Sequence, residues 1–411
     1  MNARRLEARA WYESLKPREL EGHEVTLLEG GREYFPALVE ALAAARSEAF
    51  LETYLFEDDE SGRMVAQAMA QAARRGVRVR VTVDGYGTPR LPGAAGEMLR
   101  AAGVEVETFR PGRGALPLDR HRLRRMHRKL AVVDGRVAFV GGINLLDDLR
   151  DPNHGALAQP RVDFAVRVRG PLVASAHLAA QRLWWELSVV NRPLLAMREA
   201  RASWPRLVED LVSDVTPAGP MRASLVLRDN FRFRRAIERE YLRAIGRARR
   251  EVLIANAYFF PGSRFRRALL AAARRGVRVR LLLQGRVEYV LPHYAAQGLY
   301  DELLREGVEI VQYRLSFLHA KVAVIDDRAT VGSSNIDPFS LLLAREANVF
   351  VNDPAFAQEL RQRIERLIAE GGEALQLVHH RRRPLLVRLF NRFALLVMRV
   401  GVAITGMGQG Y

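Results

Sequence analysis

The stretch Ala72-Ala-Arg-Arg-Gly-Val-Arg-Val-Arg80 occurs a second time, residue for residue, at positions 272 to 280. An identical run that returns 200 positions later indicates an internal duplication of the chain. In both copies a strand-like apolar run comes first, a helix-like segment ends at a glycine, and a second buried strand follows. These segments are 49–56, 62–75, Gly76 and 77–83 in one copy, and 252–260, 264–275, Gly276 and 277–283 in the other.

A strand, a helix and a second strand at this spacing form a βαβ unit. The sequence therefore predicts an α/β protein in which each half holds a mostly parallel sheet covered by helices. Prolines between positions 191 and 221 interrupt the pattern and place the boundary between the halves there. We expect an N-terminal arm at 1–21, a first half at 22–200, a second half at 201–378 and a basic tail at 379–411.

The composition limits what the protein can do. The chain has 411 residues, a net charge of +17 and no cysteine. Disulfides, zinc-thiolate sites and cysteine nucleophiles are therefore excluded, and a basic chain is expected to meet an anionic partner such as nucleic acid, a membrane leaflet or a phosphorylated substrate. The first 20 residues have the pattern of neither a signal peptide nor a membrane anchor.

Lysine is almost absent. Of the 64 basic residues only Lys16, Lys129 and Lys321 are lysines, and the other 61 are arginines. A lysine retained in so arginine-rich a chain is expected to need its compact ammonium group with three donors.

Each half carries the same motif downstream of the repeat. The first copy is His127-Arg-Lys129-Leu-Ala-Val-Val-Asp134, followed by Gly141-Gly-Ile-Asn144. The second is His319-Ala-Lys321-Val-Ala-Val-Ile-Asp326, followed by Gly332-Ser333-Ser-Asn335. Corresponding places in a duplicated chain favour a functional site over chance. The interval after the second motif is one residue shorter, which predicts a deletion in the turn. His23, His154, His177 and His293 have no repeat partner and are expected on the surface or in loops.

Both motifs read as strands, so each histidine lies on the same strand face as its lysine, about 7 Å along the strand. If the halves pack about a twofold axis, both pairs can converge on one cleft. Two imidazoles, two ammonium groups and the amides of Asn144 and Asn335 then suit a tetrahedral phosphorus. The lysines neutralise its oxygens, the amides donate hydrogen bonds, one histidine attacks and the other protonates the leaving oxygen.

At these residues the chain resembles the phospholipase D superfamily, whose mark is a duplicated His-x-Lys-x4-Asp motif followed by Gly-Gly/Ser and Asn. Near-identities with the shorter, B-type branch of bacterial cardiolipin synthases occur at 51–56, 124–129, 254–261 and 329–338. The resemblance implies two phospholipase D-like α/β sandwich halves, packed about a pseudo-twofold axis around one shared active site. It also implies a reaction that needs no metal or other cofactor and passes through a covalent phosphohistidine.

The resemblance also implies individual roles. His127 is the expected nucleophile, and His319 the expected general acid and then base. Asp163 and Glu346 match the acidic residues that orient the histidines across the interface. Asp134 and Asp326 complete the catalytic motif, although we favour a structural role for them as ion-pair partners. The expected phosphate ligands beside Lys129 and Lys321 are Asn144, Ser333 and Asn335.

The C-terminal tail helps to identify the expected substrate. The segment 385–403 is apolar except for Arg388, Asn391, Arg392 and Arg399. Such a helix is about 28 Å long, barely a bilayer core, and each arginine at mid-membrane would cost about 2.5–3.5 kcal/mol. On a helical wheel the arginines share one face, opposite Leu386, Phe390, Phe393, Val397 and Val400. The pattern predicts an amphipathic helix in the lipid interface, with a helix packed on the protein core as the alternative.

A phosphodiester transferase on a membrane is expected to act on phospholipid. The expected reaction is that of a cardiolipin synthase: a phosphatidyl group passes from one phosphatidylglycerol to another and glycerol is released. The expected place is the cytoplasmic face of the bacterial inner membrane, held peripherally by anionic lipid. One alternative is a phospholipase D-type phosphodiesterase or nuclease with the same site, although nucleic acid suits the apolar tail poorly. The other is a membrane scaffold with a relic site, which the intact motifs oppose. The acceptor, the order of the histidines and the oligomeric state stay open.

Overall fold

The computed structural model describes residues 15–91, 93–111, 124–190, 215–229, 233–338, 340 and 344–404. Most of the expected N-terminal arm lies outside these residues, and so does the expected boundary between the halves at position 200. The division into an arm, two halves and a tail therefore stays a prediction.

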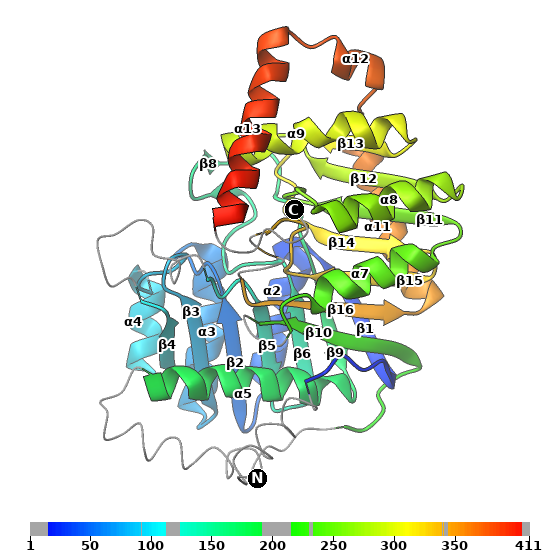
Figure 1. Cartoon of the computed structure of the whole chain (residues 1–411). Helices are drawn as coiled ribbons and strands as arrows, with labels where there is room; N and C mark the ends of the chain where they lie inside the picture. Colours follow the sequence, from blue (N-terminus) through cyan, green and yellow to red (C-terminus); the bar gives the residue numbers. More distant parts are fainter. Residues whose placement is uncertain are drawn as a thin grey trace, which may run out of the picture.

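One continuous sheet of 15 strands runs through both halves (Figure 1). Its order is β17-β13-β12-β11-β14-β15-β16-β10-β1-β9-β6-β5-β2-β3-β4. Apart from β17, each strand has a counterpart at the same distance from the centre, where β1 and β10 pair antiparallel. The two halves are thus related by a pseudo-twofold axis through this central pair.

The strands of the first half are β1 (Leu20–Glu29), β2 (Glu48–Thr53), β3 (Arg78–Asp84), β4 (Glu105–Phe109), β5 (Lys129–Val133), β6 (Val137–Gly141) and β9 (Phe164–Arg169), with a separate hairpin of β7 (Arg150–Asp151) and β8 (Gly155–Ala156). Those of the second half are β10 (Met221–Arg228), β11 (Glu251–Asn256), β12 (Arg278–Gln284), β13 (Glu309–Tyr313), β14 (Lys321–Ile325), β15 (Arg328–Gly332), β16 (Glu346–Asn352) and β17 (Gly372–Ala374).

The prediction of a mostly parallel sheet is wrong. In the first half β2, β3 and β4 are parallel, whereas β5, β6, β9 and β1 join them in antiparallel pairs. A tight turn connects β5 to β6, and its residues Asp134 and Gly135 both have positive φ, as a short hairpin requires. The second half repeats this with Asp326 in a turn that is one residue shorter. The deletion is absorbed there, because Gly332 still ends β15 as Gly141 ends β6.

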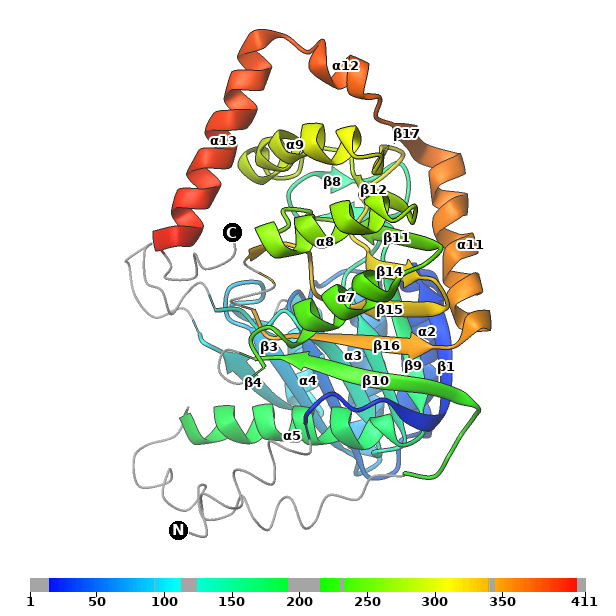
Figure 2. The same ribbon diagram turned by 45° about the vertical axis from the view of Figure 1, so that its right-hand side comes forward.

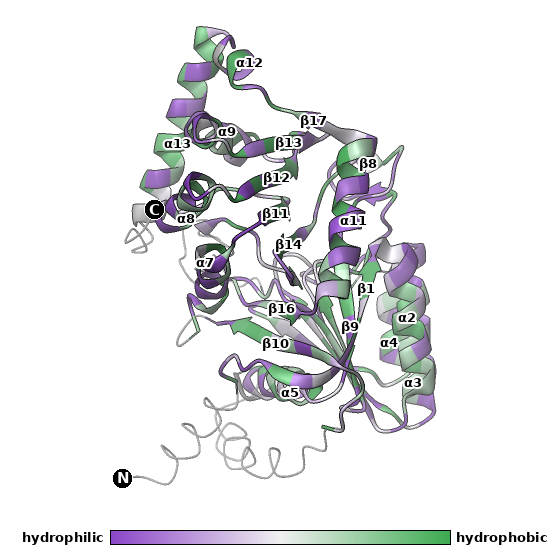
Figure 3. Cartoon of the chain, turned by 90° about the vertical axis from the view of Figure 1, so that its right-hand side faces the viewer, coloured by the Kyte–Doolittle hydropathy of each residue, from purple (hydrophilic) through white to green (hydrophobic). Residues whose placement is uncertain are grey.

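Helices cover both faces of the sheet, in opposite senses in the two halves. Figure 3 shows α2, α3 and α4 on one side of the lower half and α7, α8 and α9 on the other side of the upper half. The opposite faces are covered by α5 and α11 (Figure 2). The helices are α2 (Gly30–Ala44), α3 (Glu60–Arg74), α4 (Gly93–Ala101), α5 (Leu172–Val190), α7 (Ala236–Arg247), α8 (Ser263–Arg274), α9 (Val290–Arg305), α11 (Pro354–Gly371), α12 (Leu377–Arg381) and α13 (Leu385–Ile404).

The repeated segments form the elements that the sequence predicts. Helix α3 begins after Asp59, whose carboxylate accepts a hydrogen bond from Gly62 N. Gly76 and Gly276 follow α3 and α8 with φ of +91° and +83°, a conformation that glycine adopts without strain. The strands β3 and β12 come next, so the strand, helix, strand prediction is confirmed in both halves.

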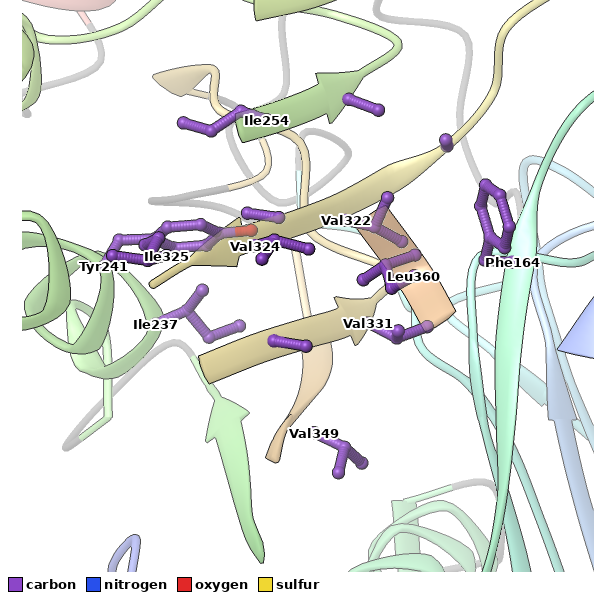
Figure 4. Close-up of a cluster of buried hydrophobic side chains, with 14 of the residues drawn as sticks. Phe164, Ile237, Tyr241, Ile254, Val322, Val324, Ile325, Val331, Val349 and Leu360 are labelled. Atoms are coloured by element: carbon purple, nitrogen blue, oxygen red, sulfur yellow. The ribbon is translucent and has the colours of Figure 1, made fainter. Parts of the chain in front are cut away.

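Buried apolar side chains fill the space on both faces of the sheet. Figure 4 shows β14 and β15 in the second half, with Ile237 and Tyr241 of α7 to one side and Leu360 of α11 to the other. The surface prediction is wrong for His23 and His177, which are fully buried. The imidazole of His177 lies 2.9 Å from the carboxylate of Glu48, which allows its burial.

Helix α13 lies against α9 and has two apolar faces. Its buried face carries Ala394 and Met398, and Gly298 of α9 lets the two helices come close (Figure 1). A second face is exposed and carries Leu385, Leu386, Leu389, Phe390, Phe393, Leu396 and Val400. The packed helix that was the alternative therefore exists, and it still leaves a large apolar surface uncovered by the described residues.

Candidate active site

The two motifs meet at the junction of the halves because each is held by the backbone of the other half. Lys129 begins β5 and Lys321 begins β14. His127 N donates to the carbonyl of Arg345 at 3.0 Å, and His319 N donates to that of Val162 at 2.7 Å. The four motif side chains are thus fixed around one place, although they are far apart in the sequence.

Each histidine is paired with a carboxylate from the opposite half. His127 Nδ1 lies 3.1 Å from Glu346 Oε1, and His319 Nδ1 lies 2.6 Å from Asp163 Oδ2. Both carboxylates are buried, whereas the two imidazoles are each 16% exposed. A partner on Nδ1 fixes the ring and leaves Nε2 to react. The structure therefore places Asp163 and Glu346 where the resemblance implies orienting residues.

The lysines lie between these pairs. Lys129 Nζ donates to His127 O at 2.8 Å and lies 5.4 Å from the centre of the Tyr54 ring. Lys321 is fully buried, and its Nζ donates to His319 O and lies 3.7 Å from Asp163 Oδ2. Both ammonium groups are thus buried next to the two histidine–carboxylate pairs.

Burial and mutual repulsion shift the pKa values of these groups. Burial, reinforced by the charge of Lys321, lowers the pKa of His319 to about 3 although Asp163 opposes it. Burial and the charge of Lys129 lower the pKa of His127 as well. Burial lowers the pKa of Lys129 to about 7, and the charge of Lys321 contributes. Burial is the largest cause of each shift because it disfavours the charged forms, and an anion bound beside these groups would oppose it.

The residues expected to bind phosphate differ in what they do. Ser333 is buried, and its hydroxyl donates to Glu346 and accepts from Ala347 N, so it holds the carboxylate that holds His127. Asn144 Oδ1 accepts from Leu55 N at 3.1 Å. Asn335 Oδ1, also buried, has no hydrogen-bond partner among the described residues. The geometry makes Ser333 a positioning residue. Asn335 Nδ2 donates to the Ser340 hydroxyl at 3.4 Å, so the atom of Asn335 left without a partner among the described residues is an acceptor.

Asp134 and Asp326 lie at the far ends of the motif strands, about 16 Å from their lysines at the usual rise of a strand. The carboxylate of Asp134 accepts from the backbone amides of residues 46, 47 and 48, and that of Asp326 from those of residues 249, 250 and 251. These bonds fix the turns that lead into β2 and β11. The expectation that these carboxylates act catalytically does not fit this placement. Their hydrogen-bond partners are backbone amides and, for Asp134, the Ser47 hydroxyl, rather than the basic side chains we expected.

Sequence reasoning missed two further features of the site. The ring of Tyr54 lies 5.0 Å from that of His127, and its only sequence signal is its place at the end of the first apolar run. The hydroxyl of Tyr258 donates to Glu288 at 2.5 Å. Burial raises the pKa of Glu288, although the bond from Tyr258 and the charges of Arg161 and Lys321 oppose this. Glu288 has no counterpart in the motifs, so nothing in the sequence pointed to it.

Comparison with known proteins agrees with this geometry. The family model described as "Cardiolipin synthase, PLD-like domain" matches residues 38–156 and 241–368. The chain is 42% identical over 349 residues to a protein named cardiolipin synthase B from Salmonella typhi, covering 85% of this chain and 81% of that protein. It is 32% identical to a probable cardiolipin synthase from Bacillus subtilis (strain 168), covering 90% of this chain and 71% of the relative.

Among solved structures, the phosphatidylserine synthase of Haemophilus influenzae Rd KW20 superimposes with a TM-score of 0.65 at 14% identity, over 99% of this chain and 100% of that one. At this identity the likeness concerns the fold alone. The duplicated motifs, the shared site and the matched relatives together place the chain: it belongs to the cardiolipin synthase family of phospholipase D-like proteins.

Proposed function

We propose that the protein is a cardiolipin synthase, which transfers a phosphatidyl group from one phosphatidylglycerol to another and releases glycerol. The exchange of carboxylates between the halves is the main support for this proposal, because it orients two imidazoles beside two lysines at the junction of the halves. Relatives that carry this name, at 41–42% identity over most of the chain, support the choice of substrate.

In the first step Nε2 of His127 attacks the phosphorus of one phosphatidylglycerol. The P–O bond to the glycerol headgroup breaks, and His319 gives a proton to the leaving oxygen. His319 is neutral in the empty site because its pKa is about 3, so it gains this proton only when the phosphodiester anion lies beside it and raises that pKa. Lys129 and Lys321 balance the charge that develops on the non-bridging oxygens.

In the second step a hydroxyl of another phosphatidylglycerol attacks the phosphohistidine. His319 takes the hydroxyl proton, an O–P bond forms, and the bond from phosphorus to His127 breaks. The products are cardiolipin and an enzyme in its starting state. Water that reached the phosphohistidine instead would give phosphatidic acid, so exclusion of water favours transfer.

The test is to incubate the purified chain in detergent with phosphatidylglycerol and EDTA. We expect cardiolipin and free glycerol in equal amounts, since each transfer releases one glycerol. His127→Ala and His319→Ala are each expected to abolish transfer, and enzyme denatured in detergent at neutral pH, where the P–N bond survives, should carry labelled phosphatidyl on His127. Phosphatidic acid as the sole product would make the protein a hydrolase, and cleavage of added DNA without lipid turnover would favour the nuclease.

We further propose that α13 holds the enzyme on the membrane surface by its exposed apolar face. No helix among the described residues is long and apolar enough to cross a bilayer. Arg388, Arg392 and Arg399 of α13 are exposed too, and each can add on the order of 1 kcal/mol of attraction to an anionic leaflet. The cytoplasmic face of the bacterial inner membrane, which is rich in anionic lipid, is the proposed place.

Co-sedimentation with vesicles that contain phosphatidylglycerol tests this membrane contact. The double variant Leu389→Glu with Phe393→Glu places two charges on the exposed face of α13 and should lose binding. Met64→Glu is the matched control, since Met64 is also an exposed apolar residue but lies on α3. Equal loss of binding in both variants, or in neither, would contradict a specific role for α13.

A further inference from the structure

A cavity of about 250 Å³ opens next to the candidate active site in the second half. It lies at the carboxyl ends of β11 and β12, where Ala257, Gln284 and Asn335 line it. From there it extends between α9 and α13 to Met398. One end of the cavity therefore includes Asn335, one of the expected phosphate ligands, and the other adjoins the helix that we place on the lipid.

The duplication explains why there is space at this position. Glu48 pairs with Arg78 in the first half and Glu251 pairs with Arg278 in the second, so Tyr54 and Ala257 occupy corresponding places. The ring of Tyr54 fills its place and lies against His127. The methyl group of Ala257 cannot fill the equivalent volume. The two sides of the active site are thus built for different occupants.

The inner end of the cavity suits hydroxyl groups. Gln284 and Asn335 are 7% and 3% exposed, and Gln284 Nε2 and Asn335 Oδ1 have no hydrogen-bond partner among the described residues. One of these atoms donates and the other accepts, which together match a hydroxyl. A buried polar atom without a hydrogen-bond partner is costly, so a ligand that bonds to both of these atoms gains binding free energy. The Tyr258–Glu288 pair at the same end makes it unsuited to a second phosphate.

The part of the cavity that is open to solvent at Arg286, which we call its mouth, suits a phosphate. Arg286 lines the cavity with an exposed side chain, and its Nε donates to the carbonyl of Arg314. Within the described part of the chain, no carboxylate lies within ion-pair distance of its guanidinium. An arginine in this setting can pair with a phosphate oxygen at the mouth.

We propose that this cavity is the acceptor site: it takes the glycerol headgroup of the second phosphatidylglycerol, whose own phosphate is held by Arg286 at the mouth. The inference rests on the proposed function and assigns a place to its second substrate. The terminal hydroxyl lies toward Asn335 and attacks the phosphohistidine; its proton passes to His319 as the bond from phosphorus to His127 breaks. The acyl chains continue along the exposed apolar face of α13.

The roles of the mouth and of the inner end can be separated by comparing two acceptor substrates, phosphatidylglycerol and free glycerol. Free glycerol has the hydroxyls but no phosphate, and labelled glycerol that exchanges into phosphatidylglycerol reports its use. Arg286→Gln should lower cardiolipin formation about tenfold, the usual effect of losing one charged hydrogen bond, and leave glycerol exchange unchanged. Arg247→Gln is the charge-matched control, because Arg247 is exposed at the end of α7, and it should change neither rate.

Gln284→Met tests the inner end, since it keeps the length of the side chain and removes its amide. It should lower both glycerol exchange and the ratio of cardiolipin to phosphatidic acid, because both alcohols lose a partner while water does not. An unchanged ratio of cardiolipin to phosphatidic acid in Gln284→Met would overturn the assignment. An equal fall in the rates of cardiolipin formation and glycerol exchange in Arg286→Gln would overturn it too. A wild-type enzyme that released no glycerol would instead refute the proposed function.

Discussion

A buried ion pair in the first half is replaced by two alanines in the second, and this difference allows a quantitative prediction. Arg128, the middle residue of the first motif, donates to both carboxylate oxygens of Glu52, at 2.5 and 2.7 Å. Both side chains are buried. The corresponding residues of the second half are Ala320 and Ala255, which are buried too. The same strand pair is therefore built once around a salt bridge and once around methyl groups.

Removal of one partner leaves the other charge buried and unpaired. Arg128→Ala and Glu52→Ala should therefore each lower the free energy of unfolding by about 3–5 kcal/mol. Independent effects would add to about 6–10 kcal/mol in the double variant. We expect the double variant to lose no more than either single one, because it leaves no charge behind and copies the arrangement of the second half. The coupling energy is then about 3–5 kcal/mol.

Urea unfolding of the four proteins measures this cycle. Trp184 and Trp185 lie on α5, which contacts Arg128 through the carbonyl of Ala179, so their fluorescence reports on the first half. Additive losses in the double variant would refute the reasoning, since they would mean that each residue is needed for contacts other than the pair. A double variant that still makes cardiolipin would also show that the first motif does not need its arginine.

Three further predictions concern the site itself. Lys129→Arg and Lys321→Arg should each lower kcat/KM by about 100-fold, because a guanidinium cannot place its charge where a buried ammonium lies, whereas Lys16→Arg on the surface should have no effect. The pKa of Lys129 is about 7 and its charged form binds the anion, so kcat/KM measured from pH 5 to 9 should fall as the pH rises through about 7; a flat profile over this range would contradict the shift. Ser333→Ala should lower kcat about 10- to 100-fold at unchanged KM, because Glu346 loses the hydrogen bond that holds it against His127. A change in KM alone would argue against a role for Ser333 in positioning Glu346.

The repeat, the types of the repeated elements and the motif residues could be predicted from the sequence, because identical runs and strand alternation are local signals. The order of the sheet was not predictable in this way. The βαβ pattern suggested parallel strands throughout, yet Val133-Asp134-Gly135 is a hairpin turn, and this short signal would have indicated that β5 and β6 are antiparallel.

The pairing of carboxylates with histidines came from the family resemblance and not from spacing. Asp163 and His319 are 156 residues apart, and only the packing of the halves brings them together. The same holds for Glu288 and for the cavity beside Ala257, which exist because two copies of one design have diverged. A small residue where the other copy has an aromatic ring is visible in the sequence only once the register of both strands is known.

The exchange of orienting carboxylates has a consequence for how such a chain could arise. In each half the histidine is oriented by a carboxylate from the other half. An ancestral protein with a single copy would therefore have been active only as a homodimer. Two identical subunits carry every substitution in both copies, so the donor and acceptor lipids would contact the same lining residues. Fusion into one polypeptide removes that constraint: each moiety can then specialise, one for holding the intermediate and one for admitting the incoming alcohol.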